Sequence, residues 1–194
     1  MDNLVSIIYA LCGLSYTILA GKGKFCCFIF GLLSSVLYAF LSFRNALWGS
    51  FLLNFLYYIP LQIISLFKWI QNTDTKTKSI KKVKLSKRIL IISFLSALIL
   101  TVILYYFLKM SGDNQPVLDS IVTIFSILGM YLTMQRALEQ WFIWTIVNLA
   151  TLIIWIIALI QGMKVYATVL LWLIYLILGI IFYFQWKKEI SSNQ

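Results

Sequence analysis

The feature of this sequence that most constrains its fold is a succession of apolar runs, each about as long as a membrane span. A helix needs about 20 apolar residues to cross the hydrocarbon core of a bilayer. Runs of that length alternate with the chain's few charged residues and predict seven spans, over residues 4–20, 25–42, 47–70, 89–109, 117–135, 141–162 and 165–186. The expected fold class is therefore an all-α integral membrane protein with seven transmembrane helices, surrounded by membrane lipid.

Composition excludes several classes of function. Of the 194 residues, 62% are hydrophobic and 11% are charged, a bias well beyond that of soluble domains. Histidine is absent and the three cysteines lack a C-x-x-C spacing, so we expect no metal site and no disulfide framework. There is no G-x-x-x-x-G-K-[ST] loop, so we expect neither ATP hydrolysis nor a cofactor. An enzyme is the least expected class, because Asp119 has no acid–base partner near it in the sequence.

The distribution of Lys and Arg sets the expected orientation. Segment 71–88, QNTDTKTKSIKKVKLSKR, carries seven Lys or Arg and one Asp, and the positive-inside rule places it in the cytoplasm. An odd number of spans across the cell membrane then puts the N-terminus outside the cell and the C-terminus in the cytoplasm. Of the 16 basic residues, only Arg44, Lys109 and Lys164 would face outward. We therefore interpret the net charge of +10 as a topology signal and expect no nucleic-acid partner.

The two ends of the chain resemble each other. An offset of 114 residues aligns residues 6–33 with the fifth and sixth spans without a gap, and an offset of 117 aligns the third span with the seventh; among the pairs are Lys22/Arg136, Tyr58/Tyr175 and Trp69/Trp186. This pattern predicts a 3+1+3 arrangement of parallel repeats: a first repeat over 1–70, a basic loop and linking helix over 71–116, and a second repeat with its tail over 117–194. Transporters with internal repeats bind substrate near the membrane midplane, between the repeats. Chance similarity between apolar helices is the alternative.

A polar and aromatic stripe marks the sixth predicted span. At 100° per residue, Trp141, Trp144 and Asn148 lie within about 60° of one another on one helix face. Trp141 could instead belong to an interfacial aromatic belt, and Asn148 could join helices by a hydrogen bond. These three residues are our first candidates for a substrate-binding face.

A second stripe occupies one face of the fifth predicted span. Asp119, Thr123, Ser126 and Met130 lie within about 60° of one another, and a polar line of this kind is costly when it faces lipid. We therefore expect it to face protein or a water-filled cavity, with Asp119 and Thr123 as candidate binding residues. Because Asp119 follows Pro116 by three residues, it could also be a first-turn carboxylate stabilised by the helix dipole.

The third predicted span carries amides and a proline. Asn54 and Tyr58 lie near one face with Gln62 to one side, and Pro60 can open the helix between them. All three polar residues are candidates for substrate binding. Indole faces bind cations and flat rings, and amides can bind hydroxyls, so a positively charged heteroaromatic ring with a sugar would suit these side chains.

Two segments resemble a known family of membrane proteins. The sequences PVLDSIVTIFSILGMYLTMQRALEQWFIWTIVN (116–148) and ALWGSFLLNFLYYIPLQIISLFKW (46–69) are similar to the nicotinamide riboside transporters of the PnuC type. The resemblance extends to Trp186, and its specific parts are Pro116 with Asp119, the pair Trp141-x-x-Trp144, and Asn148.

The resemblance implies a fold similar to full-length SWEET transporters, a homotrimer, and facilitated diffusion of nicotinamide riboside, which a cytoplasmic kinase then traps. It places Trp141, Trp144 and Asn148 in the substrate pocket. Where nicotinamide riboside members carry a glutamine in the third span, this chain has Asn54, so the ligand could be thiamine or another nucleoside-like vitamin. The alternative from another class is a non-transporting sensor or assembly subunit whose polar stripes only join helices.

Overall fold

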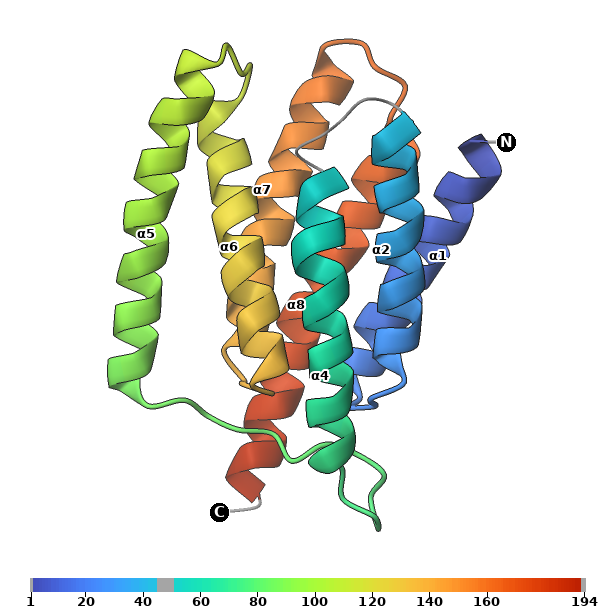
Figure 1. Cartoon of the computed structure of the whole chain (residues 1–194), viewed down its shortest axis with the longest axis vertical. Helices are drawn as coiled ribbons and strands as arrows, with labels where there is room; N and C mark the ends of the chain where they lie inside the picture. Colours follow the sequence, from blue (N-terminus) through green and yellow to red (C-terminus); the bar gives the residue numbers. More distant parts are fainter. Residues whose placement is uncertain (1, 45–50, 193–194) are drawn as a thin grey trace. The chain divides into compact units, whose positions relative to one another are not determined.

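The computed structural model describes residues 2–44 and 51–192, and its regular structure over these residues is helical (Figure 1). The chain divides into two compact units. Unit 1 comprises residues 1–82 and 133–136, and unit 2 comprises residues 83–132 and 137–194. The predicted start of the third span, residues 47–50, lies outside the described residues.

Unit 1 is built from α1 (Asp2–Gly21), α2 (Cys27–Arg44), η1 (Leu53–Tyr58) and α4 (Ile59–Gln71). The helix α1, the helix α2 and the continuous η1–α4 alternate in direction (Figure 1), and α2 packs against α1 and against η1 and α4. Phe28 and Trp69 are fully buried, with ring centroids 5.0 Å apart and planes at 88°, an edge-to-face geometry that aromatic pairs favour. The Trp69 indole N–H donates to the Thr133 carbonyl at 2.9 Å, which joins residues 133–136 to the rest of this unit.

The third span is a π-helix that continues into an α-helix. Residues Leu53–Tyr58 form η1, whose last bond is donated by the Ile59 N–H to the Asn54 carbonyl. Pro60 follows at once. Proline has no N–H, and in an α-helix its ring clashes with the carbonyl four residues earlier, so a wider turn before Pro60 relieves this contact. Pro60 is therefore preceded by a wider, hydrogen-bonded turn, and the 100° spacing used to place Asn54 and Tyr58 on one face does not apply across η1.

Unit 2 is built from α5 (Lys87–Met110), α6 (Pro116–Met134), α7 (Gln140–Ile160) and α8 (Tyr166–Ser192). Ser86 caps α5 by accepting a hydrogen bond from the Ile89 N–H, and Pro116 begins α6 at the position where a missing N–H costs nothing. The core joins α5, α6 and α7 around Phe125, Leu132, Ile143 and Val147. The α7 and α8 helices form the most extensive pair in the described structure.

Helix lengths agree with six of the seven predicted spans. Six of the described helices are long and apolar enough to cross a membrane: α2, the continuous η1–α4, α5, α6, α7 and α8. In the part of α1 whose side chains are described, the apolar segment covers Ile7–Gly21. The α8 helix continues six residues beyond its predicted span, where Gln185 donates to Glu189 at 3.1 Å across one turn, a pairing that supports helices in water.

The basic connection after α4 is ordered by contacts within unit 1. Asp74 accepts hydrogen bonds from the Lys76 and Thr77 N–H groups, and the Lys24 ammonium donates to the Lys78 carbonyl at 2.7 Å. The Arg136 guanidinium donates to the Lys81 carbonyl at 3.0 Å. The α1–α2 turn, the basic loop and the α6–α7 turn therefore meet at one end of this unit.

Candidate functional site

Trp144 lies half-buried on α7 with its indole against the backbone of α6. A Cβ atom added to Gly129 would lie 3.0 Å from Trp144 Cε2 and 3.2 Å from both Cδ2 and Cζ2. Ordinary carbon–carbon contacts are about 3.5–4.0 Å, so the absence of a side chain at Gly129 is what lets the indole approach this closely. Gly129 therefore determines the position of the Trp144 ring.

Asn148 lies one turn further along α7 and is held against α8. Its Nδ2 atom donates to the Tyr175 carbonyl at 3.0 Å, and its side chain is 8% exposed. Gly179 on α8 allows the neighbouring Thr145 to approach closely, because a Cβ there would lie 3.0 Å from Thr145 Oγ1, whereas its distance of 3.7 Å from Asn148 Nδ2 would be an ordinary contact. The bond to Tyr175 fixes the amide but uses only part of its capacity of two donors and one acceptor.

Trp141 has a different environment from Trp144. It is 3% exposed, and its ring centroid lies 5.0 Å from that of Phe182 and 5.7 Å from that of Trp186. A belt residue at a membrane surface would keep its ring at the headgroup level, whereas this ring is enclosed by α8. The Trp141 Nε1 atom is buried and has no hydrogen-bond partner among the described residues.

The predicted stripe on α6 is half-buried at its start and buried further along. Asp119 and Thr123 are partly exposed, whereas Ser126 and Met130 are buried. Asp119 lies in the first turn of α6 and interacts with Asp113 in the preceding loop. This placement fits the first-turn carboxylate alternative and leaves Asp119 at the end of the stripe farthest from Met130.

The other three candidates belong to unit 1. Asn54 and Gln62 are buried and Tyr58 is partly exposed. The Gln62 amide donates to Ser35 Oγ at 2.7 Å, while its Oε1 atom lies against Gly31 and has no hydrogen-bond partner among the described residues. Trp141, Trp144, Asn148, Asp119 and Thr123 therefore belong to unit 2, and Asn54, Tyr58 and Gln62 form a separate group in unit 1.

Sequence reasoning missed the small residues that position these side chains. Gly129 and Gly179 leave room for Trp144 and Thr145, and Gly31 leaves room for Gln62 and the Tyr16 ring. A glycine inside an apolar helix is the signal that could have identified them, because it marks close helix contact. The hydroxyl of Tyr16 is also buried and lacks a hydrogen-bond partner among the described residues.

The arrangement suits binding rather than bond-breaking chemistry. Its groups are indole faces, amides and hydroxyls, which stack on rings and exchange hydrogen bonds. Within residues 2–44 and 51–192, no group of three or more His, Cys, Asp or Glu residues could hold a metal ion.

Comparisons with known proteins give a consistent result. Residues 3–188 match the family described as nicotinamide mononucleotide transporter. The chain is 29% identical over 161 residues to the nicotinamide riboside transporter PnuC of Neisseria mucosa, covering 81% of this chain and 61% of that protein. It is 25% identical over 157 residues to the protein of the same name from Haemophilus influenzae, covering 79% of this chain and 69% of that protein. The chain thus spans about three fifths of the length of the Neisseria relative.

A solved structure resembles the whole chain. The crystal structure of the vitamin B3 transporter PnuC superposes with a TM-score of 0.81 at 27% sequence identity, covering 100% of this chain and 84% of the other.

Proposed function

The chain is a multi-pass membrane protein that belongs to the nicotinamide mononucleotide transporter family, and from this premise we propose that it carries nicotinamide riboside into the cell. Two relatives bear the name of nicotinamide riboside transporter. The observation that carries the proposal is the α7 face, where the half-buried Trp144 ring and the Asn148 amide are each held in place by a neighbouring helix.

Each of these residues binds a different part of the substrate in the proposed complex. The cationic nicotinamide ring stacks on Trp144, an interaction worth roughly 0.5–2 kcal/mol. Asn148 binds the ribose side, and Trp141 closes the ring subsite from its position against α8. Asp119 and Thr123 on α6, together with Asn54, Tyr58 and Gln62 in unit 1, complete the proposed set of substrate-binding residues.

The 3+1+3 arrangement of parallel repeats is part of the proposal, with the division at 70 and 116 and with α1 as the first of seven spans. A contact within each unit supports it. Gly31 faces Gln62 in unit 1, and Gly179 faces Thr145 in unit 2. Under the two repeat offsets, Gly31 corresponds to Thr145 and Gln62 to Gly179. Equivalent helix pairs are thus in close contact at equivalent positions, with the large and small partners exchanged.

We place the protein in the inner (cytoplasmic) membrane. Its N-terminus lies outside and its C-terminus lies in the cytoplasm. The contacts of Lys24 with Lys78 and of Arg136 with Lys81 support this orientation. These contacts bring together the α1–α2 turn, the basic loop and the α6–α7 turn. The proposed orientation puts all three in the cytoplasm.

Facilitated diffusion without an ion gradient, trapping of the product by a cytoplasmic kinase and assembly as a homotrimer complete the proposal. They rest on the resemblance stated for the sequence. Uniport is consistent with spans that carry Asp119 as their one acidic side chain, because a chain of ionisable groups is the usual route for proton coupling.

Calorimetric titration of the purified protein with nicotinamide riboside and with thiamine tests the substrate. We expect saturable binding of the riboside, lost in Trp144→Ala and kept in Trp155→Ala, which removes the same side chain three turns further along α7. Binding of thiamine alone would change the cargo.

Uptake into liposomes separates a transporter from a sensor. The transporter proposal expects riboside accumulation that Asn148→Leu reduces. Binding without uptake would favour the non-transporting alternative, in which Asn148 only joins α7 to α8 and its replacement leaves binding unchanged.

A further inference from the structure

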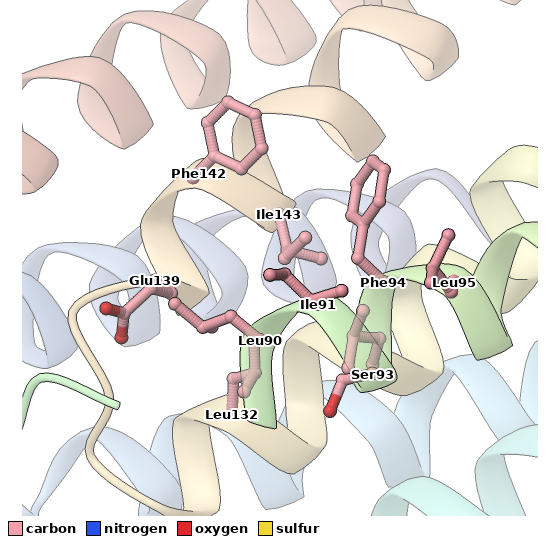
Figure 2. Close-up of a pocket in the computed structure, with 10 residues that line it drawn as sticks. Leu90, Ile91, Ser93, Phe94, Leu95, Leu132, Glu139, Phe142 and Ile143 are labelled. Atoms are coloured by element: carbon pink, nitrogen blue, oxygen red, sulfur yellow. The ribbon is translucent and has the colours of Figure 1, made fainter. Parts of the chain in front are cut away.

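Unit 2 contains a pocket of about 300 Å³. It lies between α5, α6 and α7 (Figure 2) and is lined chiefly by Leu90 and Phe94 of α5, Leu128 and Leu132 of α6, and Phe142 and Ile143 of α7. None of the candidate substrate-binding residues lines it. The pocket is therefore separate from the proposed substrate-binding residues.

The lining is apolar almost throughout. Its two residues with polar side chains are Ser93 and Glu139. The Glu139 carboxylate accepts a hydrogen bond from the Leu85 N–H at 3.3 Å, and Figure 2 shows it directed away from Phe142 and Ile143. Water needs two or more polar partners to be stable in such a space, so the occupant must be apolar.

The pocket is open toward the surroundings of α5. Ile91 and Leu95 line it and are themselves 58% and 53% exposed. In α5, all of which the structure describes, Ala97 alone is buried. A helix of this length and composition presents its exposed face to lipid tails. Lipid tails are therefore the apolar groups that can enter the pocket.

The size of the pocket favours a single chain over a helix. An α-helix with side chains is about 10 Å across, so a space of about 300 Å³ does not admit a helix from a second copy. The methylene groups of one unbranched acyl chain fit an apolar space of this size.

Positive charge lies at the end of α5 next to the pocket. Lys87 precedes Leu90 and Ile91 by one turn, and Arg88 and Lys84 are exposed beside it. Segment 75–88 contains no acidic residue, and Glu139 is the one carboxylate lining the pocket. Basic groups beside gaps between membrane helices attract anionic lipid headgroups.

We propose that this pocket binds one acyl chain of an anionic phospholipid from the surrounding bilayer, with Lys87 and Arg88 at its phosphate. The lipid would fill the gap between α5 and the α6–α7 pair. The residues that line the pocket are distinct from the candidate substrate-binding residues.

Photo-crosslinking tests this site in the intact protein. The protein is placed in phosphatidylcholine nanodiscs with a small fraction of either phosphatidylglycerol or phosphatidylcholine that carries a diazirine in one acyl chain, and labelled residues are mapped by mass spectrometry. We expect labelling at Phe94, Leu128 and Phe142. Two cations acting on one anionic headgroup should favour the phosphatidylglycerol probe by about 10- to 30-fold.

Two variants locate the interaction, each with a matched control on α5. K87Q/R88Q should bring the labelling by the two probes to within about twofold, whereas K109Q at the other end of the helix should not. Ile91→Trp should fill the pocket entrance and abolish labelling inside it. Ile99→Trp, at an equally exposed position two turns away, should leave labelling unchanged.

Three outcomes would overturn the proposal. Equal labelling by both probes would show that charge does not select the lipid. Labelling spread evenly along α5 would indicate bulk bilayer lipid. Absence of labelling at the pocket residues, with labelling elsewhere on α5, would show that lipid does not occupy the pocket.

Discussion

Replacing Gly129 by alanine tests whether this glycine positions the Trp144 indole. The new Cβ would lie 3.0–3.2 Å from three ring atoms, about 0.5 Å inside ordinary contact. Overpacking of this kind costs about 1–3 kcal/mol. Against this, alanine is favoured over glycine in a helix by about 1 kcal/mol. The net effect should be a loss of about 0–2 kcal/mol of unfolding free energy.

A double-mutant cycle with Trp144→Ala isolates the contact. Without the indole, Gly129→Ala loses its steric cost and should stabilise the protein by about 1 kcal/mol. The coupling between the two positions is then about 1–3 kcal/mol. For a chain of this size, 1 kcal/mol corresponds to about 2–4 °C in Tm, which thermal unfolding followed by circular dichroism in detergent can resolve.

The same variant separates positioning from folding. If the ring is displaced, riboside affinity should fall by about 2- to 30-fold, the range of one lost stacking contact, even where Tm changes little. An equal change in Tm in both backgrounds would refute the reasoning, because it would show that Gly129 and Trp144 act independently.

Three further predictions concern other parts of the chain. Trp69→Phe keeps a ring against Phe28 but removes the N–H that donates to the Thr133 carbonyl, so Tm should fall by an amount corresponding to about 1–3 kcal/mol; an unchanged Tm would contradict this anchor. Gln62→Leu removes the hydrogen bond to Ser35 together with an unpartnered oxygen and should be nearly neutral for Tm, whereas Ser35→Ala leaves the Gln62 amide without its partner and should cost about 1–3 kcal/mol. The Thr77 and Lys76 N–H groups lower the pKa of Asp74, so the turn is stabilised above the ordinary carboxyl pKa and loses this stabilisation as the pH falls through the lowered value; the Thr77 amide shift in an NMR titration should follow this, and Asp74→Asn should remove the pH dependence.

The helices could be predicted from the sequence because each apolar run ends where charged or polar residues begin. The predicted span 89–109 corresponds to Lys87–Met110, and 117–135 to Pro116–Met134. The π-helix Leu53–Tyr58 could not be predicted in the same way. Its bonding pattern involves only backbone groups, and Pro60 indicates a disturbance of the helix without specifying whether it bends or widens.

The candidate site was predictable as a helix face but not as a set of contacts. The 3.6-residue period places Trp144 near Asn148 because both belong to one helix. The partner of Asn148 is the backbone carbonyl of Tyr175, a group that every residue possesses, so no residue type indicates it. The burial of Trp141 depends on Phe182 and Trp186, which pack against it only once α7 and α8 associate.

The exchanged pairs Gly31 with Gln62 and Thr145 with Gly179 have a consequence for how such chains diverge. In each contact the spacing of two helices limits the combined volume of two side chains, not the identity of either. A substitution that adds bulk on one helix is tolerated when the facing residue becomes smaller. Among relatives we therefore expect each of the four positions to vary when it is considered alone, and each facing pair to covary as one large and one small residue.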